Sequence, residues 1–429
     1  MKILMVNKFY YIMGGSERYY FELTKILEAH GHEVIPFAMK DPKNFKTEYE
    51  EYFVDNIEFN LGSAWEKVKN SGRITARIIY SLQARKRIES LIEKTRPDIA
   101  HLHMIDHQIS PSILHSLKKY NIPVILTAHQ SKVICPNYRM FNWNTMQNCE
   151  KCLDGHYYHP IIEKCHKNSR MAGLLIAVET YLHKMMRIYE DNVDIFHVPS
   201  KFFQQKFTQA GIDPRKIEQL YYTIQIDQYK PHYENEDYYV YFGRLEEAKG
   251  LMTLLKAAEK VKKSQLYIIG KGDHRAELEQ FVAAKNITNV KFLGARYGEE
   301  LKDLISKSKF IVVPSECYDN SPLVVYEAYA MGKPVIGSIM GGIPELIDNR
   351  ETGLLFQAGD SDELADRIDF LLSYPQLLNE YGRNARTKAE REFSPEVHYQ
   401  KILTKYQRLL GEDVDESVRA EQQAMLRTR

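Results

Sequence analysis

Short apolar runs alternate with longer segments of helical periodicity from the first residues of the chain onward. Lys2 to Asn7 is such a run. A loop with Gly14 and Gly15 follows it, and then a segment, Ser16 to His30, whose apolar residues recur at helical spacing. Short and wholly apolar strands are typical of parallel sheets that are covered on both faces. The pattern therefore predicts strand–helix–strand units.

The alternation continues in two series, which a polar, Tyr-rich stretch at residues 229–238 separates. Two doubly wound α/β domains with parallel sheets fit this pattern, and we expect a ligand site in the cleft between them, at the carboxyl ends of the strands. We assign residues 1–204 to the first domain, 205–393 to the second and 413–429 to a polar, frayed tail. The further strands that the pattern predicts lie at residues 33–37, 99–102, 124–127, 195–198, 239–242, 266–269, 290–293, 310–313, 335–337 and 354–356.

Composition narrows the function classes. The chain has 429 residues, and its 58 Lys and Arg residues against 57 Asp and Glu residues give a formal charge of +1. A dedicated nucleic-acid binder would usually be strongly basic, so we expect no nucleic-acid partner. No run reaches the ~20 apolar residues of a membrane helix, and the N-terminal apolar run is too short for a signal peptide. We therefore expect a cytoplasmic protein.

Two segments are candidate anion sites. Arg244 and Lys249 lie just beyond the strand predicted at 239–242, where two cations could neutralise a diphosphate and stabilise the charge that grows as it departs. A solvated surface pair is the alternative. Gly14 and Gly15 precede a helix, whose free N–H groups could receive an anion, or they form only a tight turn.

Two carboxylates follow the strand predicted at 310–313. Asp319 stands in the loop and Glu327 stands eight residues later in the next helix, so both can face one cleft. A carboxylate accepts hydrogen bonds from vicinal hydroxyls, which suits a ribose or a hexose. The alternative is a helix-capping Asp319 and a half-buried Glu327 that pairs with Lys333.

In this order and spacing, the motifs of the chain resemble those of the retaining glycosyltransferases of family 4. The resemblance covers residues 1–410, nearly the whole chain. It rests on Gly14-Gly15-Ser16-Glu17-Arg18, Pro97-Asp98-Ile99 to His103, Thr127-Ala128-His129, Gly243-Arg244-Leu245 with Lys249-Gly250, Asp319 to Glu327, Gly341-Gly342-Ile343-Pro344-Glu345, and Thr352 to Phe356 with Gly359-Asp360.

The resemblance implies a GT-B architecture, in which two Rossmann-like domains hold a nucleotide-diphosphate sugar in the cleft and the last helices, residues 394–412, cross back onto the first domain. It implies that Arg244 and Lys249 hold the donor diphosphate, that Glu327 binds the nucleotide ribose, and that His129 lies near the anomeric carbon. Arg244, Lys249, His129 and Asp319 form the implied catalytic set, and the further donor-binding positions are Gly14, Gly15, Gly243, Gly270, Asn320, Ser321, Pro322 and Leu323.

Two positions depart from the family pattern. Asp319 stands where relatives commonly have Glu, which is longer by one methylene, so the sugar hydroxyl that it reaches is open. Gln130 follows His129 where many relatives have His-Asp, which removes a charge close to the reaction centre.

The implied activity is a retaining transfer of a sugar to a saccharide or lipid-linked acceptor, in cell-surface polysaccharide or glycolipid biosynthesis. No catalytic metal is expected, because the two cations would neutralise the leaving diphosphate. A GT-B sugar-nucleotide epimerase or a phosphorylase is the enzymatic alternative, but neither motif set is apparent. A non-catalytic sugar-binding module is the third interpretation, although it would have no need of the diphosphate cations.

Four of the five cysteines, Cys135, Cys149, Cys152 and Cys165, follow His129 in one segment with the spacing C-x13-C-x2-C-x12-C. This pattern fits a closed, tetrahedral structural zinc site. Too few apolar residues lie between them to stabilise the segment, and a metal would supply what is missing. Reduced thiols and a redox pair are the alternatives.

A basic stretch precedes the second strand–helix unit. Residues 67–87 carry seven Lys and Arg residues and no acid, and apolar residues interleave with them at helical spacing. Such a surface could contact anionic lipid and bring the protein to the cytoplasmic face of a membrane. A helix packed on the core with a solvated cationic face is the alternative.

Overall fold

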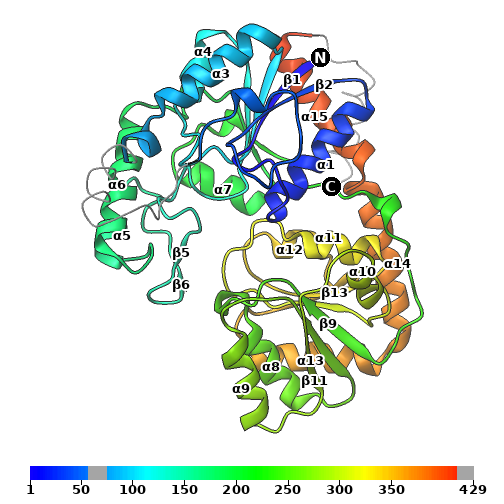
Figure 1. Ribbon diagram of the computed structural model, residues 1–429. Helices are drawn as coiled ribbons and strands as arrows, with labels where there is room; N and C mark the ends of the chain where they lie inside the picture. The colour runs from blue at the N-terminus through cyan, green and yellow to red at the C-terminus, as the bar shows by residue number, and fades with distance from the viewer. Residues whose placement is uncertain (57–74, 413–429) are drawn as a thin grey trace.

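The computed structural model describes residues 1–56 and 75–412. It contains two α/β domains, one above the other in Figure 1, and each is built on a six-stranded parallel sheet. The two doubly wound domains predicted from the apolar pattern are therefore confirmed. The predicted tail, residues 413–429, lies outside the described residues, as does 67–74 of the basic stretch.

The N-terminal sheet has the strand order β2-β1-β3-β4-β7-β8. Its last strand, β8, pairs with β7, so this sheet continues to Gln219, beyond the boundary that the sequence predicts at residue 204. The strands are β1 (Lys2–Val6), β2 (Glu33–Phe37), β3 (Ile99–Leu102), β4 (Val124–Thr127), β7 (Ile195–Val198) and β8 (Ile217–Gln219). The helices are α1 (Gly15–Ala29), α3 (Leu82–Thr95), α4 (Ile113–Lys119), α5 (His159–Glu163), α6 (Arg170–Met185) and α7 (Lys201–Gln209).

The C-terminal sheet has the order β11-β10-β9-β12-β13-β14, which is the nucleotide-binding order 3-2-1-4-5-6. The direction of strand succession reverses between β9 and β12, and ligands of such sheets bind at this switch point. The strands are β9 (Tyr238–Phe242), β10 (Gln265–Ile269), β11 (Val290–Gly294), β12 (Ile311–Val313), β13 (Val335–Ser338) and β14 (Gly353–Phe356). The helices are α8 (Leu251–Lys260), α9 (Arg275–Ala284), α10 (Gly298–Ser306), α11 (Leu323–Ala330), α12 (Ile343–Leu346), α13 (Ser361–Ser373), α14 (Pro375–Glu392) and α15 (Pro395–Leu410).

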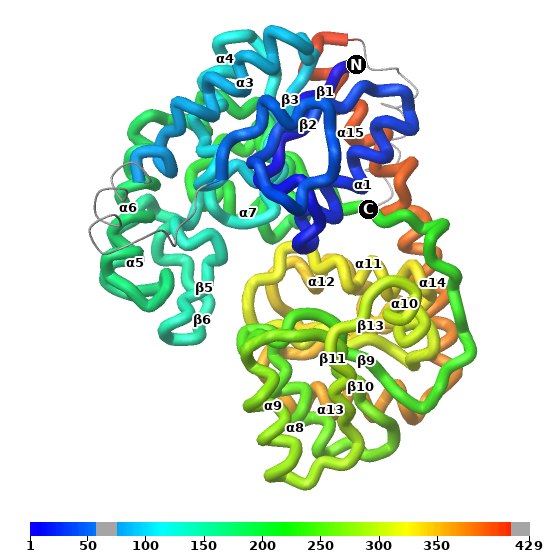
Figure 2. The backbone as a smooth tube through the Cα atoms, viewed as in Figure 1, coloured from blue at the N-terminus to red at the C-terminus, as the bar shows by residue number. Residues whose placement is uncertain are grey.

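The last helix returns to the N-terminal domain. Figure 2 shows the chain leaving the C-terminal domain along α14, after which α15 lies beside α1. His398 accepts or donates a 2.9 Å hydrogen bond with the Tyr19 hydroxyl, and the Tyr406 hydroxyl lies 2.7 Å from His101 Nδ1. These buried polar contacts fix α15 on the first sheet.

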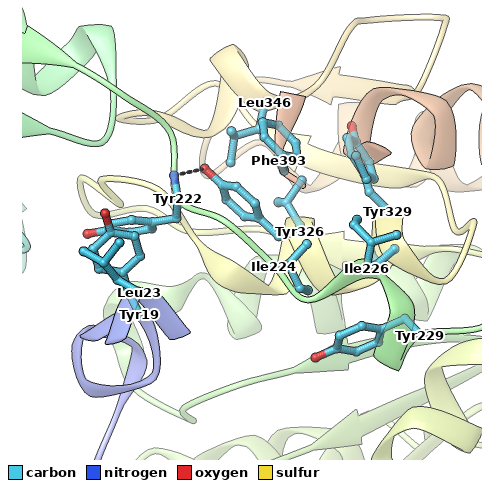
Figure 3. Packing of buried hydrophobic residues seen from close by; sticks show 14 of the residues in the cluster. Tyr19, Leu23, Tyr222, Ile224, Ile226, Tyr229, Tyr326, Tyr329, Leu346 and Phe393 are labelled. Atoms are coloured by element: carbon cyan, nitrogen blue, oxygen red, sulfur yellow. Dashed lines mark hydrogen bonds between the residues drawn. The ribbon is translucent and has the colours of Figure 1, made fainter. Parts of the chain in front are cut away.

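One apolar cluster is shared by the two domains. It runs from Tyr19 on α1 through Tyr222 to Tyr326 on α11 and Phe393, as Figure 3 shows. The Tyr222 amide donates to the Tyr326 hydroxyl at 3.3 Å within it. Two further clusters cover the other faces of the two sheets. Within the described residues, no helix is both long and apolar enough to cross a bilayer.

Candidate active site

Glycines open the carboxyl edge of the C-terminal sheet. A Cβ atom on Gly270, which follows β10, would lie 1.8 Å from the carbonyl oxygen of Gly243, which follows β9, and both residues have φ near +150°. Only glycine fits this close approach, because a side chain would overlap the neighbouring backbone. The two predicted glycines therefore lie side by side and leave the strand ends free of side chains.

Arg244 and Lys249 follow at this edge, each beside a carboxylate. Arg244 Nη1 lies 2.5 Å from Glu246, and Lys249 Nζ lies 2.5 Å from Asp319 Oδ1. Burial alone would lower the pKa of Lys249, but Asp319 and, to a smaller extent, Cys317 together hold that pKa above its usual value. Lys249 therefore keeps a positive charge in a largely buried position.

Asp319 belongs to the donor loop, which we define as residues 314–322 between β12 and α11. Gly250 lets the Lys249 segment approach this loop, since a Cβ there would meet the Pro314 carbonyl oxygen at 1.9 Å. Gly342 stabilises the donor loop, because its amide donates a 2.7 Å hydrogen bond to the Asp319 carbonyl. Residues after β9 and after β12 thus meet at the switch point, which is where the sheet order places a ligand.

The donor loop also contacts the N-terminal domain. Leu323, just after the loop, would be 3.3 Å from a Cβ on Gly15. Asn320 bridges the domains, since its Nδ2 donates to the Ala128 carbonyl at 3.1 Å and its Oδ1 accepts from Ser200 at 2.7 Å. The Ser321 hydroxyl lies 2.6 Å from that of Tyr326, at the start of the shared apolar cluster. The loop that contains Gly14 and Gly15 and the segment before His129 therefore both lie against the donor loop or the residue that follows it.

Glu327 pairs across the domain boundary. It lies on α11 and its side chain is only 7% exposed, so an unpaired charge there would be costly. Arg18 of α1 supplies the partner, with Nη2 2.6 Å from Oε1. Lys333, which the sequence analysis considered as an alternative partner of Glu327, instead donates from Nζ to Asn235 Oδ1 at 2.7 Å. One Glu327 oxygen is engaged by Arg18, and the other can still accept hydrogen bonds.

His129 lies beside the donor loop but both of its ring nitrogens are occupied. Nδ1 lies 2.7 Å from the Tyr222 hydroxyl and Nε2 lies 2.9 Å from His103 Nδ1. Burial lowers the pKa of His129 to about 3. The ring is therefore neutral at physiological pH and cannot act as a cation in this arrangement.

Comparison with known proteins agrees with this geometry. Residues 13–228 match the family model described as Glycosyltransferase Family 4, and residues 223–388 match the model of Glycosyl transferases group 1. The chain belongs to glycosyltransferase family 4. The family resemblance seen in the motifs is thereby confirmed, and the protein is a glycosyltransferase enzyme.

The glycosyltransferase is similar in sequence to N-acetyl-alpha-D-glucosaminyl L-malate synthase of Bacillus anthracis, with 24% identity over 96% of this chain and 99% of the relative. Its fold is similar to sucrose-phosphate synthase of Thermosynechococcus elongatus, with a TM-score of 0.71 at 20% identity over 96% and 99% of the two chains. Anabaena HepE in complex with UDP-glucose is similar with a TM-score of 0.64 at 19% identity over 94% and 98%. The predicted GT-B fold is confirmed.

The glycosyltransferase carries its four clustered cysteines in a segment that we call the cysteine loop, residues 131–168. Burial raises the pKa of Cys152, with the other three thiols adding to the effect, and burial raises that of Cys165 to about 11. The four cysteines thus lie near one another, and Cys152 and Cys165 keep their thiol protons at neutral pH. However, no three His, Cys, Asp or Glu side chains in 1–56 and 75–412 form a group that could hold a metal ion, so the predicted zinc site is unsupported.

The cysteine loop instead reaches the donor loop. Its hairpin, β5 (Phe141–Asn142) and β6 (Gln147–Asn148), ends at Asn148, whose Nδ2 donates to the Glu316 carbonyl at 2.9 Å and whose Oδ1 accepts from the Tyr318 amide at 3.2 Å. Arg139 of the same loop lies 3.5 Å from Glu246, the partner of Arg244. This segment of the N-terminal domain therefore approaches the two predicted diphosphate cations.

The basic stretch is partly described. In residues 75–87, Arg85 pairs with Glu89 at 3.5 Å, Arg87 donates to the Glu51 carbonyl, and Ile78 is buried. These contacts favour the packed-helix alternative for the described part, and membrane contact through this stretch stays a prediction.

The sequence analysis assigned no role to several residues that the structure places at the site. Arg18, Arg139 and Ser200 approach the donor side from the N-terminal domain, and Glu345 of α12 caps α7 by accepting from the Lys201 and Phe202 amides. Each contact joins residues more than 100 positions apart, so local periodicity holds no signal for it. Arg18 and Glu345 fall within quoted motifs, whereas Arg139 and Ser200 do not.

Proposed function

We propose that this family 4 enzyme transfers a glycosyl unit, with retention of configuration, from a nucleotide-diphosphate sugar to a saccharide or lipid-linked acceptor. The acceptor belongs to the assembly of surface polysaccharide or glycolipid, as the family resemblance implies. The observation that carries the proposal is the partly buried Lys249–Asp319 pair at the switch point, flanked by Arg244. A charged lysine held beside a carboxylate at a nucleotide-binding edge suits a phosphate-linked sugar.

Each side chain then has a distinct task. Lys249 and Arg244 exchange their carboxylate partners for diphosphate oxygens, which leaves Asp319 free to accept hydrogen bonds from sugar hydroxyls. Glu327 uses the oxygen not held by Arg18 to accept from the ribose hydroxyls. The bound sugar is thereby oriented before reaction, which is the main contribution that positioning makes to such a transfer.

In the transfer step, the bond between the anomeric carbon and the diphosphate oxygen breaks while a bond to the acceptor oxygen forms on the same face. The acceptor proton passes to the departing diphosphate, whose growing negative charge Lys249 and Arg244 stabilise. No protein nucleophile is required on this route. Neutral His129 contributes shape and hydrogen bonding beside the donor loop rather than charge.

The test is release of nucleoside diphosphate from a panel of UDP-, GDP- and ADP-linked sugars, with Lys249→Ala as the decisive variant. We expect kcat to fall about a hundredfold or more, because one preorganised charge at the leaving group is lost. Lys256→Ala, an exposed position on helix α8 shortly after Lys249, is the matched control and should keep the wild-type rate. Wild-type turnover in Lys249→Ala would contradict the assigned role.

A further inference from the structure

The outward face of α6 has no part in the proposed transfer and is unusually apolar. Met171, Leu174, Val178, Tyr181 and Met185 recur at three- and four-residue spacing and are all exposed, the two methionines by 74%. Surface helices normally turn such a stripe toward the core. Helix α6 lies at the edge of the N-terminal domain (Figure 1), and the stripe is exposed to solvent.

The polar groups of α6 face inward instead. Between residues 171 and 183 the only charged or imidazole side chains are Glu179 and His183, and both are buried. Glu179 Oε2 accepts from Lys132 at 2.7 Å, and His183 Nε2 lies 2.8 Å from the Ile79 carbonyl oxygen. The helix is therefore held by its polar side and presents its apolar side outward.

The neighbouring helix α5 extends this surface. It packs tightly on α6, since a Cβ on Gly173 would lie 2.3 Å from the Pro160 carbonyl oxygen, and it exposes Tyr158 and Ile162. We call these seven side chains of α5 and α6 the α6 face. Contiguous exposed apolar surface of this kind marks a site of interaction with another protein or with a membrane.

Cations border the α6 face at both ends. Lys164, Lys167 and Arg170 precede or begin α6, and Lys184 and Arg187 end it. At the C-terminal end, Lys184 pairs with Glu190 and Arg187 pairs with Asp191. At the N-terminal end, the nearby Glu163 is already engaged by Lys151. The excess positive charge of the rim therefore lies at its N-terminal end, at Lys164, Lys167 and Arg170.

This charge pattern selects the partner. A second copy of α6 packed in parallel would place its basic N-terminal end against the same basic end of the first copy, which is unfavourable. An anionic lipid surface complements the rim and accepts the apolar side chains, and tyrosines such as Tyr158 and Tyr181 are suited to the headgroup level. We propose that the α6 face binds the surface of membranes that contain anionic lipid, with α6 lying in the interface plane.

The position of the face fits a lipid-linked acceptor, and this link to catalysis rests on the proposed function. Lys132 stands three residues after His129 and pairs with Glu179, so an ion pair links α6 directly to the segment that carries His129. Membrane binding itself does not depend on the transfer reaction. It can therefore be tested separately.

The test is sedimentation of the full chain with vesicles of phosphatidylcholine alone or mixed with phosphatidylglycerol. We expect the wild type to bind the mixed vesicles. The double variant Met171→Glu/Met185→Glu should bind them at least about tenfold more weakly, because two large apolar side chains no longer enter the interface. Leu82→Glu is the matched control, since Leu82 is 71% exposed at the start of α3, within the basic stretch. It should bind as the wild type does.

A charge variant tests the rim. Lys164→Glu/Lys167→Glu should lose the preference for phosphatidylglycerol, and added salt should weaken wild-type binding. The proposal is overturned if the wild type does not sediment with either vesicle, if the methionine double variant binds normally, or if Leu82→Glu is the variant that fails. It is also overturned if light scattering shows a wild-type dimer that the double variant disrupts.

Two readouts separate this proposal from the proposed function. Circular dichroism should show the same fold in all variants, because none of the replaced side chains is part of the buried core. Release of nucleoside diphosphate in the absence of vesicles should be unchanged by the α6 variants. If the wild type binds vesicles but releases no nucleoside diphosphate from any donor, the proposed glycosyl transfer is contradicted and the membrane proposal is not.

Discussion

Two lysines of the C-terminal domain, the partly buried Lys249 and the fully buried Lys333, show how a neighbouring group decides the charge of a side chain. Lys249 lies beside the Asp319 carboxylate, which keeps its pKa above the usual value in spite of burial. Lys333 is 1% exposed and donates to the neutral amide oxygen of Asn235, and burial lowers its pKa to about 7. Lys249 thus stays positively charged and can bind an anion, whereas folding disfavours the charged form of Lys333.

Lys333 should make the stability of the protein depend on pH. Its pKa falls from the usual 10.5 to about 7 on folding, so the unfolded chain binds more protons between these values. The free energy of unfolding should therefore rise with pH across this window, by up to about 1.4 kcal/mol per pH unit, and should be flat below it. In Lys333→Met this contribution is absent.

Urea unfolding of both proteins from about pH 7 to about pH 9 measures the effect as a widening difference that favours the wild type at high pH. Lys263→Met is the control, because Lys263 is exposed and forms a surface pair with Asp369. Parallel pH profiles for the wild type and Lys333→Met would show that Lys333 is not neutralised on folding.

At the scale of elements, the sequence predicted the strands that are compact apolar runs, because such a run can be recognised without knowing its neighbours in space. The buried strands β2, β3, β4 and β7 have the predicted bounds because each is a compact apolar run. Strand β8 was not predicted, since Ile217-Glu218-Gln219 has one apolar residue and forms the edge of its sheet. The two-residue strands of the cysteine loop likewise have no periodicity to detect.

The site was predictable to the same extent. Arg244, Lys249 and Asp319 stand in recognisable motifs at strand ends, and the structure brings them together. The contacts of Arg139 and Asn148 with the C-terminal domain arise only from docking of the cysteine loop. No pattern along the chain encodes such docking, because it depends on shapes that form after each domain has folded.

The docked hairpin should matter for donor binding. Asn148→Ala removes two hydrogen bonds to the backbone of the donor loop, each worth about 0.5–1.5 kcal/mol. We expect kcat/KM for the sugar nucleotide to fall about tenfold, since the loop that carries Asp319 loses its support. Asn144→Ala, exposed at the turn of the same hairpin, should have the wild-type value. Equal kinetics for the two variants would show that the hairpin is only a neighbour of the donor loop.

At the scale of the whole molecule, the two domains are joined by more than the connecting chain. The shared apolar cluster passes from Tyr19 through Tyr222 to Tyr326 and Phe393, with ring centroids 4.6 Å apart for the first pair and 4.5 Å for the last. Helix α15 adds Lys405 and Arg408, which both pair with Glu218 on β8. Because these contacts join the domains directly, we expect thermal unfolding of the wild type in one calorimetric transition.

Replacing one member of this cluster should uncouple the domains. Tyr222→Ala removes a buried ring that touches Tyr19 and Tyr326, and should cost about 3–5 kcal/mol and divide the transition into two. Tyr381→Ala, equally buried but in a cluster confined to the C-terminal domain, should cost a similar amount. Its domain loses stability while the junction stays intact, so the single transition should move to lower temperature without dividing. A divided transition in Tyr381→Ala, or a single one in Tyr222→Ala, would mean that the cohesion of the two domains comes from α15 and the donor-loop contacts rather than from the shared aromatic cluster.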